Sequence, residues 1–250
     1  MALRHKLVIL PYKRASEGAR ILARKLGIYR MPDPGLLRGG HHVINWGNTK
    51  WGVPVACRVY NRPEYVAIAI NKLDAFRTMA GAGVPIPEFT TDPAIAKAWK
   101  GSVVCRTKLE GTGGDGIVFS KNAVDIVPAR MYTRYVNKSR EYRVHVFQGK
   151  VIGYKRKVKH KDREVKDDHI RSHDNGYVYI VDPQNPPSQS ILDAAVKALA
   201  ALNLDFGGVD IVWTKKDDRA YVLEVNTAPG MTDMTGDWYA QAFKEKYARA

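Results

Sequence analysis

The sequence contains little cysteine: Cys57 and Cys105 are its two cysteines in 250 residues. They form no CxxC pair, so neither a disulfide framework nor a zinc knuckle can be built from them, and we expect reduced, buried thiols. Long hydrophobic runs are also missing. The longest, such as Val66–Ile70, span only a few residues, far short of the roughly 20 needed to cross a bilayer. We therefore expect no membrane-spanning helix.

The N-terminal stretch MALRHKLVILPYKR carries basic residues, but its apolar part is too short for the core of a signal peptide and lacks a small-residue cleavage site. We therefore expect a cytoplasmic protein. The chain also shows no internal repeat and no low-complexity tract. With 45% hydrophobic residues, it is long enough for one substantial core or two small lobes.

Basic residues exceed acidic ones, 40 Lys and Arg against 25 Asp and Glu, for a formal net charge of +15. Residues 138–171 alone hold 12 basic and 5 acidic residues, so 12 − 5 = +7 of this excess falls in one segment. Such a segment is either a solvated strand-and-loop surface or a groove that faces a polyanion. The polyanion can be nucleotide phosphates or a larger acidic partner.

Hydrophobic periodicity predicts a short α/β unit over residues 1–70, followed by a strand-rich region over 71–250. Helices are expected after Ser16, after Asn71, after Ser190, which we take as an N-cap, and from about Gly236. Strands are expected at Leu7–Leu10, His42–Trp46, Ser102–Arg106, Ile117–Ser120, Tyr142–Phe147, Val151–Lys157, Tyr177–Val181, Val209–Trp213 and Tyr221–Val225. The fold class is thus α+β, with mostly antiparallel sheet after residue 100.

Gly111–Gly116 matches the GxGxxG dinucleotide fingerprint letter for letter. That fingerprint must open a helix, whereas Ile117–Ser120 has the composition of a strand. Together with Asp205-Phe206-Gly207 the loop also imitates a protein kinase, but the sequence has no HRDxxxxN motif. A glycine-rich turn between antiparallel strands remains. It is either a surface hairpin or a loop whose backbone N–H groups approach phosphates.

Two carboxylates are predicted to face each other near the C-terminus. A hairpin centred near Asp217 pairs Asp210 with Glu224 and places Asn226 on the same face as Glu224. Facing carboxylates repel unless a cation lies between them, and Asp, Glu and Asn without His or Cys favour Mg²⁺ or Mn²⁺ over Zn²⁺. The alternative is a solvated face on which Asp210 and Glu224 pair with nearby Lys or Arg.

The segments Gly208-Val-Asp-Ile211 and Val222-Leu-Glu-Val-Asn-Thr-Ala-Pro-Gly-Met231 resemble the ending of ATP-grasp carboxylate–amine ligases. This superfamily includes D-alanyl-D-alanine ligases and ribosomal-protein glutamate ligases. The likeness extends over residues 71 to about 235. Lys72 and the segment Ala82–Pro87 resemble the "K…aGvpvP" segment, Val103–Arg106 the strand that usually reads VVVK, and Gly111–Gly116 the phosphate-covering loop.

The resemblance implies a fold in which two α/β lobes, 71–133 and 134–250, hold ATP between antiparallel sheets, after a short N-terminal unit, 1–70. It also implies ATP and Mg²⁺ or Mn²⁺ as cofactors. The residues implied for the nucleotide are Lys72, Arg106, Gly111, Thr112, Gly113, Gly114, Gly116, Thr133, Arg134, Tyr135, Val136 and Glu141, and those for the metal are Asp210, Glu224 and Asn226. Arg106 stands where lysine is usual, and the compact N-terminal unit resembles ligase-like proteins encoded by bacteriophages.

The reaction implied is phosphorylation of a carboxylate by ATP, followed by attack of an amine on the acyl phosphate. It needs charge neutralisation and not a covalent nucleophile, and the sequence has no GxSxG motif. We expect the catalytic cations to be Arg143, Arg156 and Arg171, since Tyr154–Arg156 and Ile170–Ser172 resemble basic segments of the glutamate-ligase branch. We expect surface positions for His145, His160, His169 and His173, with His173 nearest to substrate.

A rival hypothesis is a nucleic-acid-binding protein on a degenerate ATP-grasp scaffold. The intact set Asp210, Glu224 and Asn226 argues against it, because a scaffold without turnover has no reason to keep all three. A third hypothesis joins the two: a ligase whose carboxylate or amine substrate sits on an acidic polymer or nucleic acid. We favour an acidic macromolecular partner, since residues 138–171 offer more cations than a nucleotide and a small carboxylate need.

Overall fold

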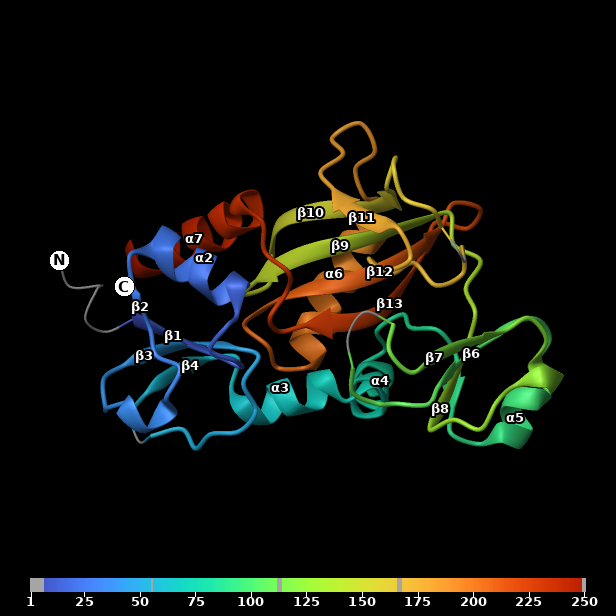
Figure 1. Ribbon diagram of the computed structural model, residues 1–250, viewed down its shortest axis with the longest axis horizontal. Helices are drawn as coiled ribbons and strands as arrows, with labels where there is room; N and C mark the ends of the chain where they lie inside the picture. Colours follow the sequence, from blue (N-terminus) through green and yellow to red (C-terminus); the bar gives the residue numbers. More distant parts are fainter. Residues whose placement is uncertain (1–6, 55, 112–113, 166–167, 249–250) are drawn as a thin grey trace.

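The computed structural model describes residues 7–54, 56–111, 114–165 and 168–248. The N-terminal part is a four-stranded parallel sheet, at the left of Figure 1. Its spatial order is β2 (Tyr29–Arg30), β1 (Leu7–Pro11), β3 (His42–Trp46) and β4 (Arg58–Tyr60). Helix α2 (Glu17–Leu26) covers one face and is capped by Ser16, as predicted, whose hydroxyl accepts from the Ala19 N–H. All of β1 is buried because its two faces contribute to two hydrophobic clusters.

Two consecutive helices, α3 (Pro63–Ile70) and α4 (Lys72–Gly81), lead out of this sheet along the lower edge of Figure 1. Asn71 caps α4, as predicted, because its side-chain oxygen accepts from the N–H groups of Leu73 and Asp74. The sequence analysis did not predict α3. The apolar run Val66–Ile70 lies inside this helix, which starts with Pro63 in its first turn.

The next sheet lies at the right of Figure 1 and is antiparallel throughout. Its spatial order is β5 (Phe89–Thr90), β8 (Met131–Arg134), β6 (Val103–Arg106) and β7 (Ile117–Ser120), with the short helix α5 (Pro93–Lys97) beside it. β6 and β7 are joined by the glycine-rich segment, so Ile117–Ser120 is a strand, as predicted, and not a helix.

A five-stranded antiparallel sheet forms the largest layer. Its spatial order is β11 (Tyr177–Ile180), β10 (Lys150–Lys159), β9 (Arg140–Phe147), β12 (Phe206–Thr214) and β13 (Arg219–Asn226). Helix α6 (Gln189–Ala201) packs its apolar side against one face through Ile191, Ala195 and Leu199. The prediction that Ser190 caps this helix was wrong: Ser188 occupies the N-cap position, and Ser190 lies in the first turn.

The last helix, α7 (Asp233–Ala248), returns to the N-terminal sheet and packs beside α2 (Figure 1). Tyr239 and Phe243 share one hydrophobic cluster with Trp46 of β3 and Phe206 of β12. The helix starts before the predicted Gly236. A Cβ at that position would lie 2.9 Å from side-chain atoms of α2, so this glycine permits close helix packing and does not mark a boundary.

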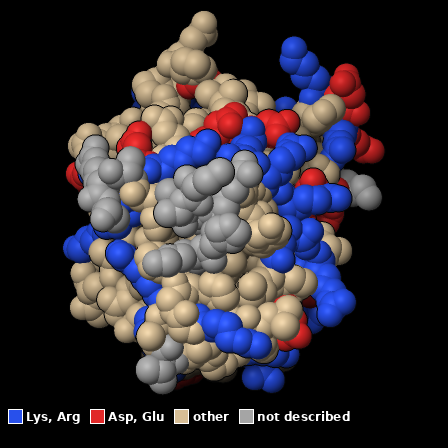
Figure 2. All heavy atoms as spheres, turned by 90° about the vertical axis from the view of Figure 1, so that its left-hand side faces the viewer, with Lys and Arg blue, Asp and Glu red and all other residues tan. Residues whose placement is uncertain are grey.

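The fold is α+β, as predicted, with antiparallel sheets after a short α/β unit. We retain 1–70 and 71–250 as proposed domains, although the cluster around Phe243 joins residues from both. Viewed from the side of the N-terminal sheet, Lys and Arg side chains form several bands, with Asp and Glu among them (Figure 2). Within the described ranges, no helix combines the length and apolar character needed to span a bilayer.

Candidate active site

The β12–β13 hairpin pairs Asp210 with Glu224, as predicted. The turn side of the hairpin has a different register, in which Ile211 pairs with Val222. A β-bulge between Asp210 and Ile211 shifts the pairing by one residue. The bulge therefore brings the two carboxylates opposite each other. The prediction assumed no bulge, and it named the right pair only because the assumed centre of the turn was also displaced.

Each of these carboxylates has a cationic partner from another element. Arg143 on β9 donates two hydrogen bonds to Asp210, Nε to Oδ1 at 2.6 Å and Nη2 to Oδ2 at 2.7 Å. Lys72 at the start of α4 donates to Glu224 Oε2 at 2.5 Å. Burial raises the pKa of Glu224, but the attraction and hydrogen bond of Lys72 outweigh it and bring the pKa to about 2. The Glu224 carboxylate is therefore ionised at neutral pH.

Asn226 completes this group. Its Nδ2 donates to Glu224 Oε1 at 2.9 Å and lies 3.4 Å from Asp210 Oδ2. Rotation of the amide by half a turn brings Oδ1 to the same place, where a cation between the carboxylates would meet three oxygen donors. The donor set fits a hard divalent ion. Within the described ranges, no group of three or more His, Cys, Asp or Glu residues could hold a metal ion, so a metal here would use the Asn226 amide, nucleotide oxygens or water.

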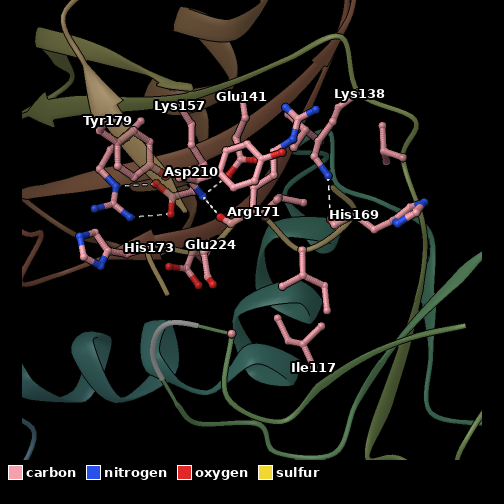
Figure 3. Close-up of a pocket in the computed structure, with 18 of the residues that line it drawn as sticks. Ile117, Lys138, Glu141, Lys157, His169, Arg171, His173, Tyr179, Asp210 and Glu224 are labelled. Atoms are coloured by element: carbon pink, nitrogen blue, oxygen red, sulfur yellow. Dashed lines mark hydrogen bonds and ion pairs between the residues drawn. The ribbon is translucent and has the colours of Figure 1, made fainter. Parts of the chain in front are cut away.

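A cavity of about 600 Å³ lies over the open face of the five-stranded sheet, opposite α6 (Figure 3). Asp210, Glu224 and Glu141 point into it from the sheet, and Ile117 lies across from them. The cavity thus lies between the two antiparallel sheets. The predicted site residues on its lining are Arg106, Gly114, Thr133, Arg134, Tyr135, Val136, Glu141, Arg143, Arg171, Asp210 and Glu224.

Five predicted residues that the structure describes are not part of this lining: Lys72, Gly111, Gly116, Arg156 and Asn226. Lys72 and Asn226 still touch the carboxylates. Arg156 does not face the cavity, because side chains alternate along β10: Lys155 and Lys157 line it, whereas Arg156 pairs with Asp182 at 2.6 Å. The residues of this basic segment that face the cavity are therefore the two neighbours of the predicted Arg156.

Arg106 is a buried cation on the lining of the cavity. It is 9% exposed and forms no salt bridge with any residue that the structure describes. Burial lowers the pKa of its guanidinium, and Glu224 counteracts this only in part. Its Nε has no hydrogen-bond partner in that same set of residues. A buried cation of this kind needs an anion from outside the chain.

The end of β8 and the residues that follow it form another wall of the cavity. Thr133 is buried at the end of β8, and Thr133–Val136 line the cavity. Glu141, 4% exposed, forms a short ion pair with Lys157, which also donates to the Arg171 carbonyl at 2.7 Å. This contact joins β9 and β10 to the segment that carries Arg171 (Figure 3).

The glycine-rich segment approaches the 170–172 segment. Gly114 has φ = 93°, and a Cβ there would lie 3.6 Å from Ile170 and 3.8 Å from Ser172. Gly116 packs so closely on Lys108 that a Cβ would lie 2.8 Å from that side chain. Thr112 and Gly113, which the resemblance implied for the nucleotide, lie outside the described residues.

The prediction of surface positions was wrong for His145, which is fully buried and lines the cavity. His169 also lines it and stacks on Phe119, with ring centroids 4.0 Å apart. Sequence reasoning missed His145, Lys155, Lys157 and Tyr179 as lining residues. The period-two spacing of Glu141, Arg143 and His145 along a strand was the signal that could have found the first of them.

In the comparison with known proteins, residues 134–247 match the family model described as D-ala D-ala ligase C-terminus. Among curated proteins, none is significantly similar to this chain. Several solved structures share its fold. The ATP-grasp ligase PsnB complexed with a minimal precursor has a TM-score of 0.67 and 15% identity over 98% of this chain and 99% of that one.

The D-alanine–D-alanine ligase from Bacillus anthracis has a TM-score of 0.63 and 15% identity over 95% of this chain and 94% of that one. The macrocyclase MdnC bound with precursor peptide MdnA, from Microcystis aeruginosa MRC, has a TM-score of 0.60 and 13% identity over 96% of this chain and all of that one. The predicted resemblance and the predicted fold are confirmed.

Proposed function

We propose that this chain, which has the ATP-grasp fold and whose residues 134–247 match the D-ala D-ala ligase C-terminus family, joins a carboxylate to an amine at the expense of ATP. In the first step a carboxylate oxygen attacks the γ-phosphorus, and ADP leaves with the electron pair of the broken P–O bond. In the second step the amine attacks the acyl carbon. Phosphate leaves with the C–O electron pair and takes up the proton that the amine loses.

The observation that carries the proposal is Arg106, a buried cation without an ion pair in the described chain, on the same cavity as Asp210 and Glu224. Its guanidinium needs an anion, and polyphosphate supplies one. In our proposal the adenine lies against Thr133–Val136 and the ribose hydroxyls against Glu141. The phosphates extend past Gly114 and Arg106 towards Arg143.

Asp210, Glu224 and Asn226 are the residues that would hold Mg²⁺ or Mn²⁺. When bound, the ion would neutralise the phosphate charge that develops during transfer. Around it, Arg143 and Arg171 supply fixed positive charge from the protein. Lys155, which faces the cavity, replaces Arg156 in this proposal.

We further propose that the substrate carboxylate is carried by an acidic peptide or polymer. Several cations of the basic segment 138–171 are already paired within the protein. Arg143, Arg156 and Lys157 each form an ion pair with a buried or half-buried carboxylate. Lys161 and Arg163 remain exposed, in the loop between β10 and β11. The PsnB and MdnC structures hold precursor peptides, which supports a peptide over a nucleic acid.

The test is ADP release by the purified protein with Mg²⁺, measured against amino acids, polyamines, polyglutamate and single-stranded DNA. Carboxylate-dependent ADP release supports the ligase. Tight binding of DNA with no nucleotide binding would favour the non-catalytic alternative. ADP release with a small carboxylate and not with polyglutamate would refute the polymeric substrate alone.

A further inference from the structure

His145 is a buried polar side chain with one ring nitrogen still available. It is 0% exposed, lies on β9 and lines the cavity. Its Nδ1 is 3.0 Å from the hydroxyl oxygen of Tyr239 on α7. Its Nε2 has no hydrogen-bond partner among the described residues. An unmatched buried polar atom beside a cavity costs free energy, which a ligand can recover.

Helix α7 builds the wall behind this histidine. The Trp238 ring lies 5.6 Å from the His145 ring and packs flat against β10 at Gly153, where a Cβ would lie 2.4 Å from the indole. Lys155 donates from Nζ to Thr232 Oγ1 at 2.9 Å and also faces the Trp238 ring. His145, Lys155 and Thr232 thus line one part of the cavity, and the aromatic side chains of α7 pack behind His145.

The hydrogen bond to Tyr239 sets which nitrogen of His145 carries the proton. Burial, together with the cations Arg143 and Lys155, lowers the pKa of His145 well below its ordinary value, so the ring is neutral. Tyr239 is fully buried, and His145 is its hydrogen-bond partner in the part of the chain that the structure describes. The phenolic proton is satisfied only when it is donated to Nδ1, which leaves the ring proton on Nε2.

Nε2–H is then a neutral donor between the cations Arg143 and Lys155, an arrangement that selects an anionic oxygen over an ammonium group. Along β9, Glu141, Arg143 and His145 point to the same face at two-residue intervals. At about 3.3 Å per residue, His145 lies about 7 Å beyond Arg143 and about 13 Å beyond Glu141. If Glu141 marks the ribose, His145 lies past the terminal phosphate, where the group that receives it must sit.

We propose that His145, Lys155 and Thr232 form the subsite for the substrate carboxylate, with His145 Nε2–H donating to one carboxylate oxygen. This inference rests on the proposed function for the placement of ATP. Lys155 supplies the opposing charge, and Tyr239 is a positioning residue that fixes the histidine tautomer. The carboxylate oxygen that is not held by His145 is then directed at the γ-phosphate.

The test is imidazole ¹⁵N NMR of the full chain with Mg²⁺ and AMPPNP, titrated with acetate and, separately, with methylammonium at constant ionic strength. We expect one histidine, absent from His145→Gln, with its proton on Nε2. Its Nε2–H resonance should shift saturably with acetate and not with methylammonium. His160→Gln, at a histidine outside the cavity lining, is the matched control and should leave this signal and its acetate response unchanged.

A response to methylammonium, a proton on Nδ1, or no acetate shift at concentrations that keep the protein folded would overturn the subsite. Tyr239→Phe adds a second readout, because the Nε2–H tautomer should lose its preference and acetate affinity should fall about tenfold. Binding of AMPPNP without an acetate response rejects the subsite and leaves the ligase proposal standing. An acetate response without AMPPNP binding supports the carboxylate subsite and rejects the ligase proposal.

Discussion

Lys72, the first residue of α4, forms an ion pair of 2.5 Å with Glu224 on β13, 152 positions further along the chain. The pair joins α4 to the hairpin that carries the proposed metal ligands. A cation bound by Glu224 would weaken the hold of Lys72 on this carboxylate and free its ammonium group for phosphate. The Lys72–Glu224 contact would thus depend on whether a cation and phosphate are bound in the cavity.

Glu224→Gln should abolish phosphoryl transfer while leaving the chain folded. The amide removes one of two anionic ligands, so Mg²⁺-dependent ADP release should fall about a hundredfold or more. Because Lys72 loses its charged partner, the melting temperature should also fall by a few degrees. An assay of ADP release tests the loss of phosphoryl transfer, and thermal melting tests the loss of stability. Lys216→Gln, in the exposed turn of the same hairpin, is the control, and full turnover in Glu224→Gln would refute the assignment.

The same residue predicts an acid-dependent loss of stability. The pKa of Glu224 is about 2 in the folded chain against an ordinary 4.5. A lowered pKa in the folded state stabilises it above about pH 4.5, and that stabilisation is lost as pH falls through about 2. The size is on the order of 3 kcal/mol. The difference in unfolding free energy between wild type and Glu224→Gln in urea should therefore be largest at about pH 5 and above, and should vanish towards pH 2. A difference that does not change with pH would contradict the ion pair.

Arg106→Met should affect folding and binding in opposite directions. Removing a buried cation that has no ion pair in the described structure should stabilise the nucleotide-free chain by about 1–2 kcal/mol. Affinity for Mg²⁺·ATP should fall about a hundredfold, because a charge-assisted phosphate contact is lost. Chemical denaturation and calorimetric titration measure the two effects, and Arg106→Lys should restore part of the affinity. Destabilisation by Met together with unchanged binding would mean that Arg106 has a structural role.

Gly114→Val tests the phosphate-covering role of the glycine-rich segment. A β-branched residue at φ = 93° is strained, and its side chain would enter the space beside Ile170 and Ser172. We expect ATP affinity to fall at least about tenfold. Lys216→Glu should leave it unchanged. Equal effects of the two variants would identify the segment as a surface hairpin.

The sequence alone predicted local features well. The caps Ser16 and Asn71 and the strand after Gly116 depend on neighbours in one element. The pairing of Asp210 with Glu224 was also correct, but the β-bulge that produces it was not predicted. The sequence did not show that Arg156 faces away from the cavity, because one residue of offset turns a side chain to the other face of a strand.

Other features depend on contacts between distant segments. The burial of His145 is produced by Trp238 and Tyr239, more than 90 positions later in the chain. Similarly, Gly236 gave the pattern of a helix start, whereas its actual role is close packing against Lys25 of α2. No local pattern carries such information, because the partner element must first be placed.

The exposed cations of the β10–β11 loop separate an acidic polymer from a small substrate. Lys161→Glu and Arg163→Glu change side chains outside the cavity lining, so turnover of a small carboxylate should remain within about twofold of wild type. If the carboxylate is carried by an acidic polymer, the same variants should raise the KM for polyglutamate about tenfold at low salt, because each reversal replaces attraction by repulsion. That effect should shrink as salt screens the charges. Steady-state kinetics over a salt series distinguish the two. Equal KM values for polyglutamate in wild type and both variants, at every salt concentration, would exclude the polymeric substrate and leave a small-molecule ligase.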